Sequence, residues 1–393
     1  MGVWRGSIKN NSGEEVAFTL EVKREGDRIV GSLVNGDDRT VSTSGSFEGN
    51  TLKLRYDFYD AELNAVITGD ELGGGFTRQW RKQTLVRKLR AQRVDGSDDA
   101  AKTASNPSNS SGGISGEWVM RVGEEPKISF WRAAFRQQGS KAQGTIIPLS
   151  GDWGDMTGSF ENNQLTLNRF DGINCRVFKA TLTPQGALEG FVDFGLFDPK
   201  RKVVAERLTA ENKSSVASLP DPKNHTRMSN AAEPFRFSFP GLDGKVVSST
   251  DERFKNKVVV VTMTGSWCPN CYDEAPVLQE LYDRYRKQGL EVVALAFEYT
   301  GDAARDTEQV RIFANRLGVT YPTLYAGAVD ETEKKLPQLV NFGAYPTTIY
   351  VGRDGLVKQI HAGFEGKATG ERFIRLKAEM EELIKELLTG KDS

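Results

Sequence analysis

Two cysteines three residues apart, Cys268 and Cys271, are the residues whose type and spacing most directly suggest chemistry. They follow an apolar β-branched run, Val258–Val261, and precede a helical pattern that extends to Gln288. A Cys-x-x-Cys pair at the point where a buried strand passes into a helix is typical of redox-active sites. The pattern therefore predicts a reversible disulfide that needs no cofactor beyond the two cysteines.

The position of the pair at a helix start predicts unequal roles for the two thiols. With Cys268 at the helix cap, Pro269 falls at the first helical position, where its missing N–H costs little. The free amide groups and the helix dipole favour a thiolate at Cys268, which should be the attacking thiol. Cys271 lies one turn further along the same face and should resolve the mixed disulfide. We therefore predict exchange with disulfide- or thiol-bearing proteins.

The alternative for a close cysteine pair is a zinc site, which needs two further Cys or His ligands. The remaining candidates are scattered: Cys175 lies in a β-rich region, His225 in a loosely composed segment and His361 near the end of a predicted sheet. Three cysteines in 393 residues are also too few for a disulfide framework. We expect no metal, and we expect Cys175 to be a packed, inert thiol.

Charge and hydropathy argue against several classes of partner. The 52 Lys and Arg residues balance 53 Asp and Glu residues, so no overall field favours nucleic acid or an anionic membrane surface. No stretch reaches the roughly 18 to 20 apolar residues of a membrane span, and Met1–Arg5 lack the features of a secretory signal. We expect no nucleic-acid partner and no transmembrane segment in this chain. A leader could have been removed, which the sequence does not decide.

Two segments of loose composition divide the chain. Residues 95–114 and 210–233 are rich in Ser, Asn, Ala, Gly or Pro, which is the composition of linkers. A chain of this length can hold more than one hydrophobic core. We therefore predict a first unit at 1–94, a second at 115–209 and a third at 234–393.

The first two units resemble each other in sequence. Gly45–Leu54 (GSFEGNTLKL) matches Gly158–Leu167 (GSFENNQLTL), which indicates an internal repeat. Apolar and polar residues alternate within each copy between closely spaced turn signals, a pattern that predicts antiparallel, half-buried strands. We expect an all-β barrel or sandwich built from the repeat, its two copies packing as one β unit. A scaffold or partner-docking role is favoured, and ligand binding stays open.

From Phe235 onward the pattern changes to apolar strands that alternate with amphipathic helices. This pattern predicts a parallel or mixed α/β sheet. The expected strands are 257–262, 290–296 and 346–351, with an antiparallel return at 356–361, and the expected helices follow the cysteines and cover about 306–317 and 370–388.

The third unit resembles the thioredoxin superfamily, and within it the TlpA/ResA-like thiol–disulfide oxidoreductases. The resemblance covers about residues 234–390 and includes an extra β-α segment between Leu290 and Tyr325. It rests on Trp267–Cys271, on Pro276 in the following helix, on Tyr345–Thr348 before a strand and on Phe239–Lys245 at the entry. The resemblance implies a C-terminal α/β thioredoxin-like domain after the β-rich region.

The resemblance also implies functional residues and a cellular setting. The Tyr345–Pro346 peptide bond is expected to be cis and to face the cysteines, leaving backbone groups free to pair with a substrate chain. The implied support and docking residues are Trp267, Pro269, Asn270, Tyr345, Pro346 and Thr347. Relatives of this kind act outside the cytoplasm of bacteria as reductants, which implies a periplasmic or extracytoplasmic location and an upstream electron donor protein.

Glu274 is the third candidate catalytic residue. It matches an acidic position of ResA-like members that lies near the thiols, where a carboxylate could accept the proton that Cys271 loses. The other interpretation, a solvated helix residue, stays open. Thioredoxins carry a buried aspartate six residues before the first cysteine, and this chain has Thr262 there. A proton route through that aspartate is therefore missing in this chain, which favours Glu274.

Other functions remain possible alternatives. A peroxiredoxin-like peroxidase would have Thr or Ser at the position of Gly265 and Pro at that of Val261. A copper carrier would have one more residue between the cysteines and a histidine nearby. From a different class, the β unit could capture a ligand or peptide and the redox domain could be accessory.

Overall fold

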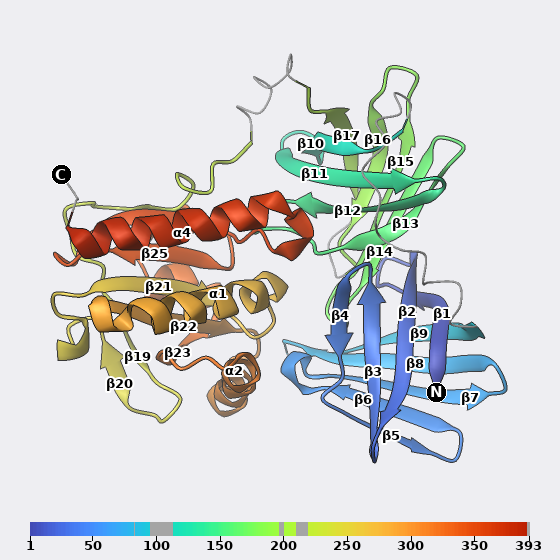
Figure 1. Cartoon of the computed structure of the whole chain (residues 1–393), viewed down its shortest axis with the longest axis horizontal. Helices are drawn as coiled ribbons and strands as arrows, with labels where there is room; N and C mark the ends of the chain where they lie inside the picture. The colour runs from blue at the N-terminus through green and yellow to red at the C-terminus, as the bar shows by residue number, and fades with distance from the viewer. Residues whose placement is uncertain (82, 95–112, 196–199, 210–218, 391–393) are drawn as a thin grey trace. The chain divides into compact units, whose positions relative to one another are not determined.

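The structure, a computed structural model, divides into two compact units (Figure 1). It describes residues 1–81, 83–94, 113–195, 200–209 and 219–390. Most of the predicted linker 95–114 and part of the linker 210–233 lie outside these residues. The β unit comprises Met1–Ile146 and Trp153–Leu219, and the C-terminal unit comprises Ile147–Asp152 and Pro220–Ser393.

The first copy of the repeat forms a nine-stranded antiparallel sheet in the order β4-β3-β2-β1-β9-β8-β7-β6-β5. The strands are β1 (Gly2–Lys9), β2 (Glu15–Glu25), β3 (Arg28–Asn35), β4 (Asp38–Val41), β5 (Ser44–Glu48), β6 (Thr51–Tyr56), β7 (Ala61–Thr68), β8 (Glu71–Trp80) and β9 (Gln83–Val94). Along β2, the buried residues Val16, Phe18 and Leu20 alternate with less buried neighbours. This is the predicted period of two.

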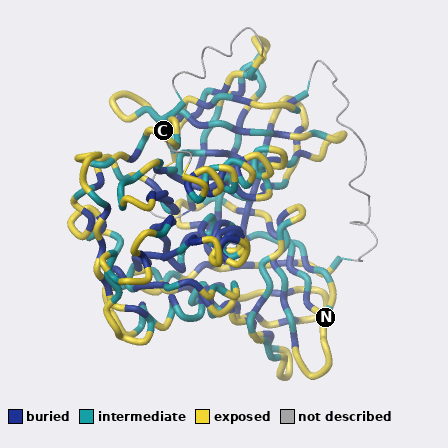
Figure 2. The backbone as a smooth tube through the Cα atoms, turned by 60° about the vertical axis from the view of Figure 1, so that its left-hand side comes forward, coloured by how far each residue is buried: buried dark blue, intermediate teal, exposed yellow. Residues whose placement is uncertain are grey.

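The second copy forms a closed eight-stranded barrel, in which β10 pairs with β17 to complete the ring. The strands are β10 (Gly116–Val122), β11 (Ser129–Gln138), β12 (Lys141–Ile147), β13 (Met156–Glu161), β14 (Gln164–Phe170), β15 (Cys175–Leu182), β16 (Leu188–Asp193) and β17 (Arg201–Arg207). Trp118, Phe135 and Phe178 contribute to a core of buried side chains, and Figure 2 shows exposed residues gathered at the turns. The predicted all-β barrel is confirmed, and each copy makes a sheet of its own.

The two matched sequence segments form the same hairpin in their respective sheets. The hairpins are β5–β6 and β13–β14, and in each the Phe of the motif pairs across the strands with the Leu, as Phe47 with Leu52 and Phe160 with Leu165. The internal repeat is therefore a repeat of structure as well as of sequence.

Buried polar contacts join the two sheets within the β unit. The Asn35 side-chain amide donates to the Phe170 carbonyl at 2.9 Å, and its oxygen accepts the Phe170 N–H at 3.1 Å. The buried Arg169 guanidinium pairs with Asp38 at 2.8 Å and with Asp171 at 2.9 Å. Removing one partner would leave an uncompensated buried charge, so these contacts fix how the copies associate.

The C-terminal unit is built on a five-stranded mixed sheet in the order β23-β22-β21-β25-β26 (Figure 1). β21 is parallel to β22 and antiparallel to β25. The strands are β21 (Val258–Thr264), β22 (Leu290–Glu298), β23 (Thr323–Ala328), β25 (Thr347–Val351) and β26 (Val357–Ala362). The helices are α1 (Pro269–Tyr285), α2 (Ala303–Leu317), α3 (Thr332–Lys335) and α4 (Glu371–Thr389). The predicted mixed α/β sheet is confirmed.

Both faces of this sheet are covered, which explains its continuous apolar strands. Every residue of β21 is buried, as expected for a central strand between two layers. Val260 packs with side chains of α1 and α4, and Val261 packs on the other face with Phe237 and other apolar side chains. The central strand is therefore packed on both faces, and it ends four residues before Cys268.

Two short strand pairs complete the unit. β19 (Ser238–Pro240) pairs with β20 (Val246–Ser248), and β18 (Arg227–Met228) pairs with β24 (Leu339–Val340). Because β18 pairs with a strand deep in the thioredoxin-like sequence, the unit reaches upstream of residue 234.

Candidate active site

Cys268 and Cys271 lie where β21 passes into α1, and they are joined as a disulfide with their Cα atoms 5.2 Å apart. Cys268 is the cap residue of α1, Pro269 is the first helical residue, and the Cys268 sulfur accepts the N–H of Cys271 at 3.3 Å. A helix N-terminus presents unpaired N–H groups and a positive dipole end. The arrangement therefore stabilises negative charge on the Cys268 sulfur.

The pair is buried in an apolar cluster. Cys268 is 4% and Cys271 1% exposed, and Ala275 and Phe313 pack with them. Trp267 and Tyr345 pack against the same cluster, with their rings 5.1 Å apart.

The residues around Pro346 form a loop beside this cluster. The Tyr345–Pro346 peptide bond is cis. The Tyr345 hydroxyl contacts the Thr332 hydroxyl at 2.5 Å, and burial raises the pKa of Tyr345. The Thr347 side chain is fully buried and donates to the Ala344 carbonyl at 2.8 Å. Tyr345 thus lies at the redox pair, while the hydroxyl of Thr347 is used within its own loop.

Asn270, between the two cysteines, is held through its side chain. Its Nδ2 donates to the carbonyls of Ser150 at 3.0 Å and Phe364 at 3.1 Å, both within the C-terminal unit. Within the dipeptide between the cysteines, Pro269 therefore begins the helix and Asn270 is anchored by its side-chain amide.

Glu274 is buried beneath the cysteines, so its interpretation as a solvated helix residue is wrong. It is 2% exposed, and its two oxygens accept the hydroxyls of Thr262 at 2.7 Å and Thr348 at 2.5 Å. Burial raises the pKa of Glu274 to about 7, against the opposing effect of the two hydroxyl bonds. The reason for its burial is its spacing, since a residue three positions after Cys271 faces the sheet as Cys271 does.

The same contact accounts for Thr262. This residue occupies the position where thioredoxins carry a buried aspartate, and its hydroxyl binds the carboxylate of Glu274. The buried acid is thus supplied from α1, and β21 contributes the hydroxyl that orients it. Its burial and its near-neutral pKa suit a group that takes up a proton.

Sequence reasoning missed a second buried carboxylate beside the redox loop. Glu298 ends β22, is 3% exposed and accepts two hydrogen bonds from Ser266. The available signal was an acidic residue directly after the apolar run Val292–Phe297, where a strand buried on both faces continues.

The remaining cysteine and the histidines lie elsewhere. Cys175 is a fully buried free thiol at the start of β15 in the β unit, and burial raises its pKa to about 12. His225 and His361 belong to the C-terminal unit, and burial lowers the pKa of each. Within the described residues, no group of three or more His, Cys, Asp or Glu side chains could hold a metal ion.

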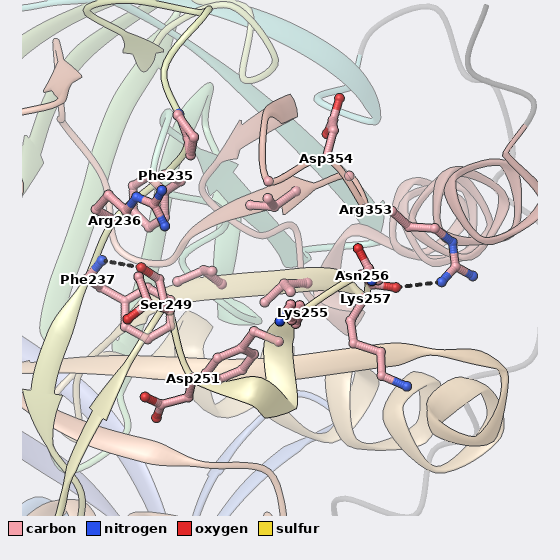
Figure 3. A pocket seen from close by; sticks show the side chains of 18 of the residues that line it. Phe235, Arg236, Phe237, Ser249, Asp251, Lys255, Asn256, Lys257, Arg353 and Asp354 are labelled. Atoms are coloured by element: carbon pink, nitrogen blue, oxygen red, sulfur yellow. Dashed lines mark hydrogen bonds between the residues drawn. The ribbon is translucent and has the colours of Figure 1, made fainter.

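A pocket of about 320 Å³ lies at the opposite end of β21 from the cysteines (Figure 3). Phe237 and Ser249 line one side and are linked by a hydrogen bond of 3.4 Å, and Arg353 donates to the Asn256 carbonyl at 2.8 Å on the other. Val259 in the first half of the strand lines the pocket, whereas the cysteines follow its last residue. The pocket is therefore separate from the redox site.

Comparisons with known proteins match this unit. The Redoxin family matches residues 228–372. Thiol-disulfide oxidoreductase ResA of Geobacillus kaustophilus (strain HTA426) is 34% identical over 121 residues, which cover 31% of this chain and 63% of the relative. The chain thus spans less than two thirds of that relative. Thioredoxin-like protein YneN of Bacillus subtilis (strain 168) is 31% identical over 140 residues, covering 36% of this chain and 75% of the relative.

Among solved structures, a putative thiol:disulfide interchange protein DsbE from Chlorobium tepidum aligns with a TM-score of 0.30 and 21% identity, covering 38% of this chain and 99% of that one. The sequence relatives agree with the fold, in which Cys268 caps the helix that follows the central strand of a mixed sheet. Through its C-terminal unit the chain belongs to the thioredoxin-like proteins of the Redoxin family, and it is similar in sequence to the thiol-disulfide oxidoreductase ResA.

Proposed function

We propose that the whole protein reduces disulfides in partner proteins through Cys268 and Cys271. The observation that carries the proposal is the disulfide at the N-terminus of α1, with the Cys268 sulfur at the helix cap. In the reduced form, the Cys268 thiolate attacks one sulfur of a partner disulfide. A mixed disulfide forms, and the other partner sulfur leaves as a thiolate that takes a proton.

The second half of the reaction requires Cys271 to lose its proton. The buried carboxylate of Glu274, one helical turn away, accepts it, and the Cys271 thiolate then attacks the Cys268 sulfur. The second partner thiol leaves reduced, and the protein retains the Cys268–Cys271 disulfide. Two electrons have passed from the protein to the partner, and a dithiol donor protein must return them.

Direction, partners and location are part of this proposal. The ResA-like relatives support an extracytoplasmic reductant whose substrates are thiol- or disulfide-bearing proteins and whose electrons come from an upstream donor. No helix in the described part of the chain has both the length and the apolar character needed to cross a membrane. The aromatic surface of Trp267 and Tyr345 beside Pro346 is the proposed place where a partner segment docks.

The test is to trap the intermediate. Cys271→Ser removes the resolving thiol, so partners should accumulate as mixed disulfides on Cys268 that mass spectrometry maps to that residue. Cys268→Ser is the matched control and should trap nothing. Trapping by both variants, or by neither while partner reduction continues, would exclude the proposed exchange.

The peroxidase alternative stays a prediction, and the same variants separate it. A peroxidase would consume hydrogen peroxide with Cys268 intact and Cys271 replaced, whereas the exchange proposed here needs a protein disulfide as the electron acceptor. Binding of a ligand by the isolated β unit is a third, independent alternative.

A further inference from the structure

Glu298 places a second buried carboxylate against the loop that leads into the redox pair. Its Oε1 accepts the N–H of Ser266 at 2.7 Å, and its Oε2 accepts the hydroxyl of Ser266 at 2.8 Å. Both residues are 3% exposed. Both oxygens of the Glu298 carboxylate therefore bind the same residue, Ser266, which lies two positions before Cys268.

The residue before Glu298 holds the next residue of the same loop. The Phe297 carbonyl accepts the indole N–H of Trp267 at 2.8 Å. A Cβ atom on Gly265 would lie 2.3 Å from the Trp267 nitrogen and 2.8 Å from the Phe297 oxygen, so loop and strand are in close contact. The end of β22 therefore fixes two consecutive loop residues, and with them the approach to Cys268.

The surroundings of Glu298 allow it to exchange a proton. Burial raises the pKa of Glu298 to about 8, against the opposing bonds from Ser266. The ionisable side chains that face it are Asp306 and Arg305 of α2, Tyr325 of β23 and Tyr345 of the loop before β25. Asp306 disfavours the charged form of Glu298 and Arg305 favours it. The carboxyl group is therefore neutral near pH 7 and ionised at higher pH.

We propose that Glu298 is a positioning residue for thiol–disulfide exchange, which clamps Ser266 to hold Cys268 at the helix end and sets by its own charge how readily Cys268 forms a thiolate. When Glu298 is neutral, it does not oppose the effect of the helix end on Cys268. When it is ionised, a buried negative charge near the loop disfavours a second one on the sulfur. The inference rests on the proposed function, since it assigns Glu298 to the same pair.

The experiment measures the rate at which iodoacetamide alkylates Cys268 in the reduced full-length protein between pH 5 and 10, resolved by peptide mass. Glu298→Gln keeps the volume, an oxygen for the Ser266 N–H and a donor for its hydroxyl, but cannot ionise. We expect a rate within about twofold of the wild type at pH 6, and a rate about threefold higher near pH 8.5. Superimposable profiles would overturn the electrostatic part of the proposal.

Glu291→Gln is the matched control. Glu291 lies at the other end of β22, where it pairs with Arg253 at 3.1 Å, so the same chemical change is made on the same strand. Its profile should follow the wild type. A change equal to that of Glu298→Gln would show an effect of the strand rather than of the clamp, and would overturn the proposal.

Two further variants test the clamp itself. Glu298→Ala leaves both Ser266 donors unpaired, and we expect alkylation of Cys268 at pH 7 to slow roughly tenfold. Ser266→Ala keeps the hydrogen bond from the backbone N–H to Glu298 and removes the one from the hydroxyl, so the alkylation rate should fall by less. If Glu298→Ala does not fold, Ser266→Ala tests the positioning role in its place. Wild-type rates in the folded variants would overturn the positioning role. Because alkylation needs no partner, failure of the wild type to reduce disulfides would instead overturn the proposed function.

Discussion

The chain holds two kinds of buried cysteine, one in each unit, and their surroundings differ more than their exposure. Cys175 in the barrel is 0% exposed and Cys268 in the C-terminal unit is 4% exposed. Burial raises the pKa of Cys175 to about 12, and Asp171 and Asp193 add to this against the opposing charge of Arg87. Cys268 instead caps a helix and accepts an N–H there. Burial alone makes a thiol inert, whereas burial at a helix N-terminus can make it a nucleophile.

The largest effect that tests this comparison is loss of activity. Cys268→Ser should lower the rate of insulin disulfide reduction by roughly a thousandfold or more, because no other described thiol is placed to attack. Cys175→Ser should leave that rate unchanged. Substantial loss with Cys175→Ser, in a variant whose circular dichroism is that of the wild type, would contradict the separation of the two thiols.

A smaller effect is expected from the buried acid on α1. Glu274→Gln keeps the hydrogen-bonding volume but cannot accept a proton, so resolution of the mixed disulfide should slow by about a hundredfold. In the wild type the resolving rate should rise with pH through about 7, where Glu274 ionises, and then level off. The variant should lose this rise. The measurement is stopped-flow release of a thiol leaving group from a preformed mixed disulfide.

Thr348→Val is a matched comparison for the Glu274→Gln variant. It removes the hydroxyl that donates to Glu274 at 2.5 Å but leaves the carboxylate in place. The rise in resolving rate should then move to higher pH, since a bond that favours the charged form is lost. A profile that stays unchanged in both variants would exclude Glu274 as the proton acceptor.

The smallest expected effect is on the way the free energy of unfolding depends on pH. Burial raises the pKa of Glu274 to about 7 and of Glu298 to about 8, from an ordinary value of 4.5. Between 4.5 and these values the folded chain binds more protons than the unfolded chain, so the free energy of unfolding falls as pH rises from about 5 to about 8. Replacing both residues with Gln should flatten this slope. Urea denaturation at several pH values measures it, and an equal slope in the double variant would contradict the assignment.

The sequence predicted the C-terminal fold and its cysteine pair because the signals there are local. A run of β-branched residues, a cap cysteine and a proline at the first helical position specify a strand, a turn and a helix within a dozen residues. The repeat in the β unit was visible for the same reason, since the matched hairpins are short-range structures. That each copy forms its own sheet depends on pairings such as β1 with β9 and β10 with β17, which join residues far apart in the chain.

The surroundings of the thiols depended on contacts that no local pattern records. The resemblance to ResA-like members implied that Glu274 lies near the thiols, but whether it is buried could not be predicted, because Thr262 and Thr348 reach it from two different strands. Glu298 meets Ser266 only because β21 and β22 run parallel and end side by side. The sequence by itself determined which residues are proposed to exchange electrons, through the chemistry of two cysteines at a helix start. The tertiary structure alone decided which buried acids surround them, because burial and strand pairing set the pKa of a carboxyl group.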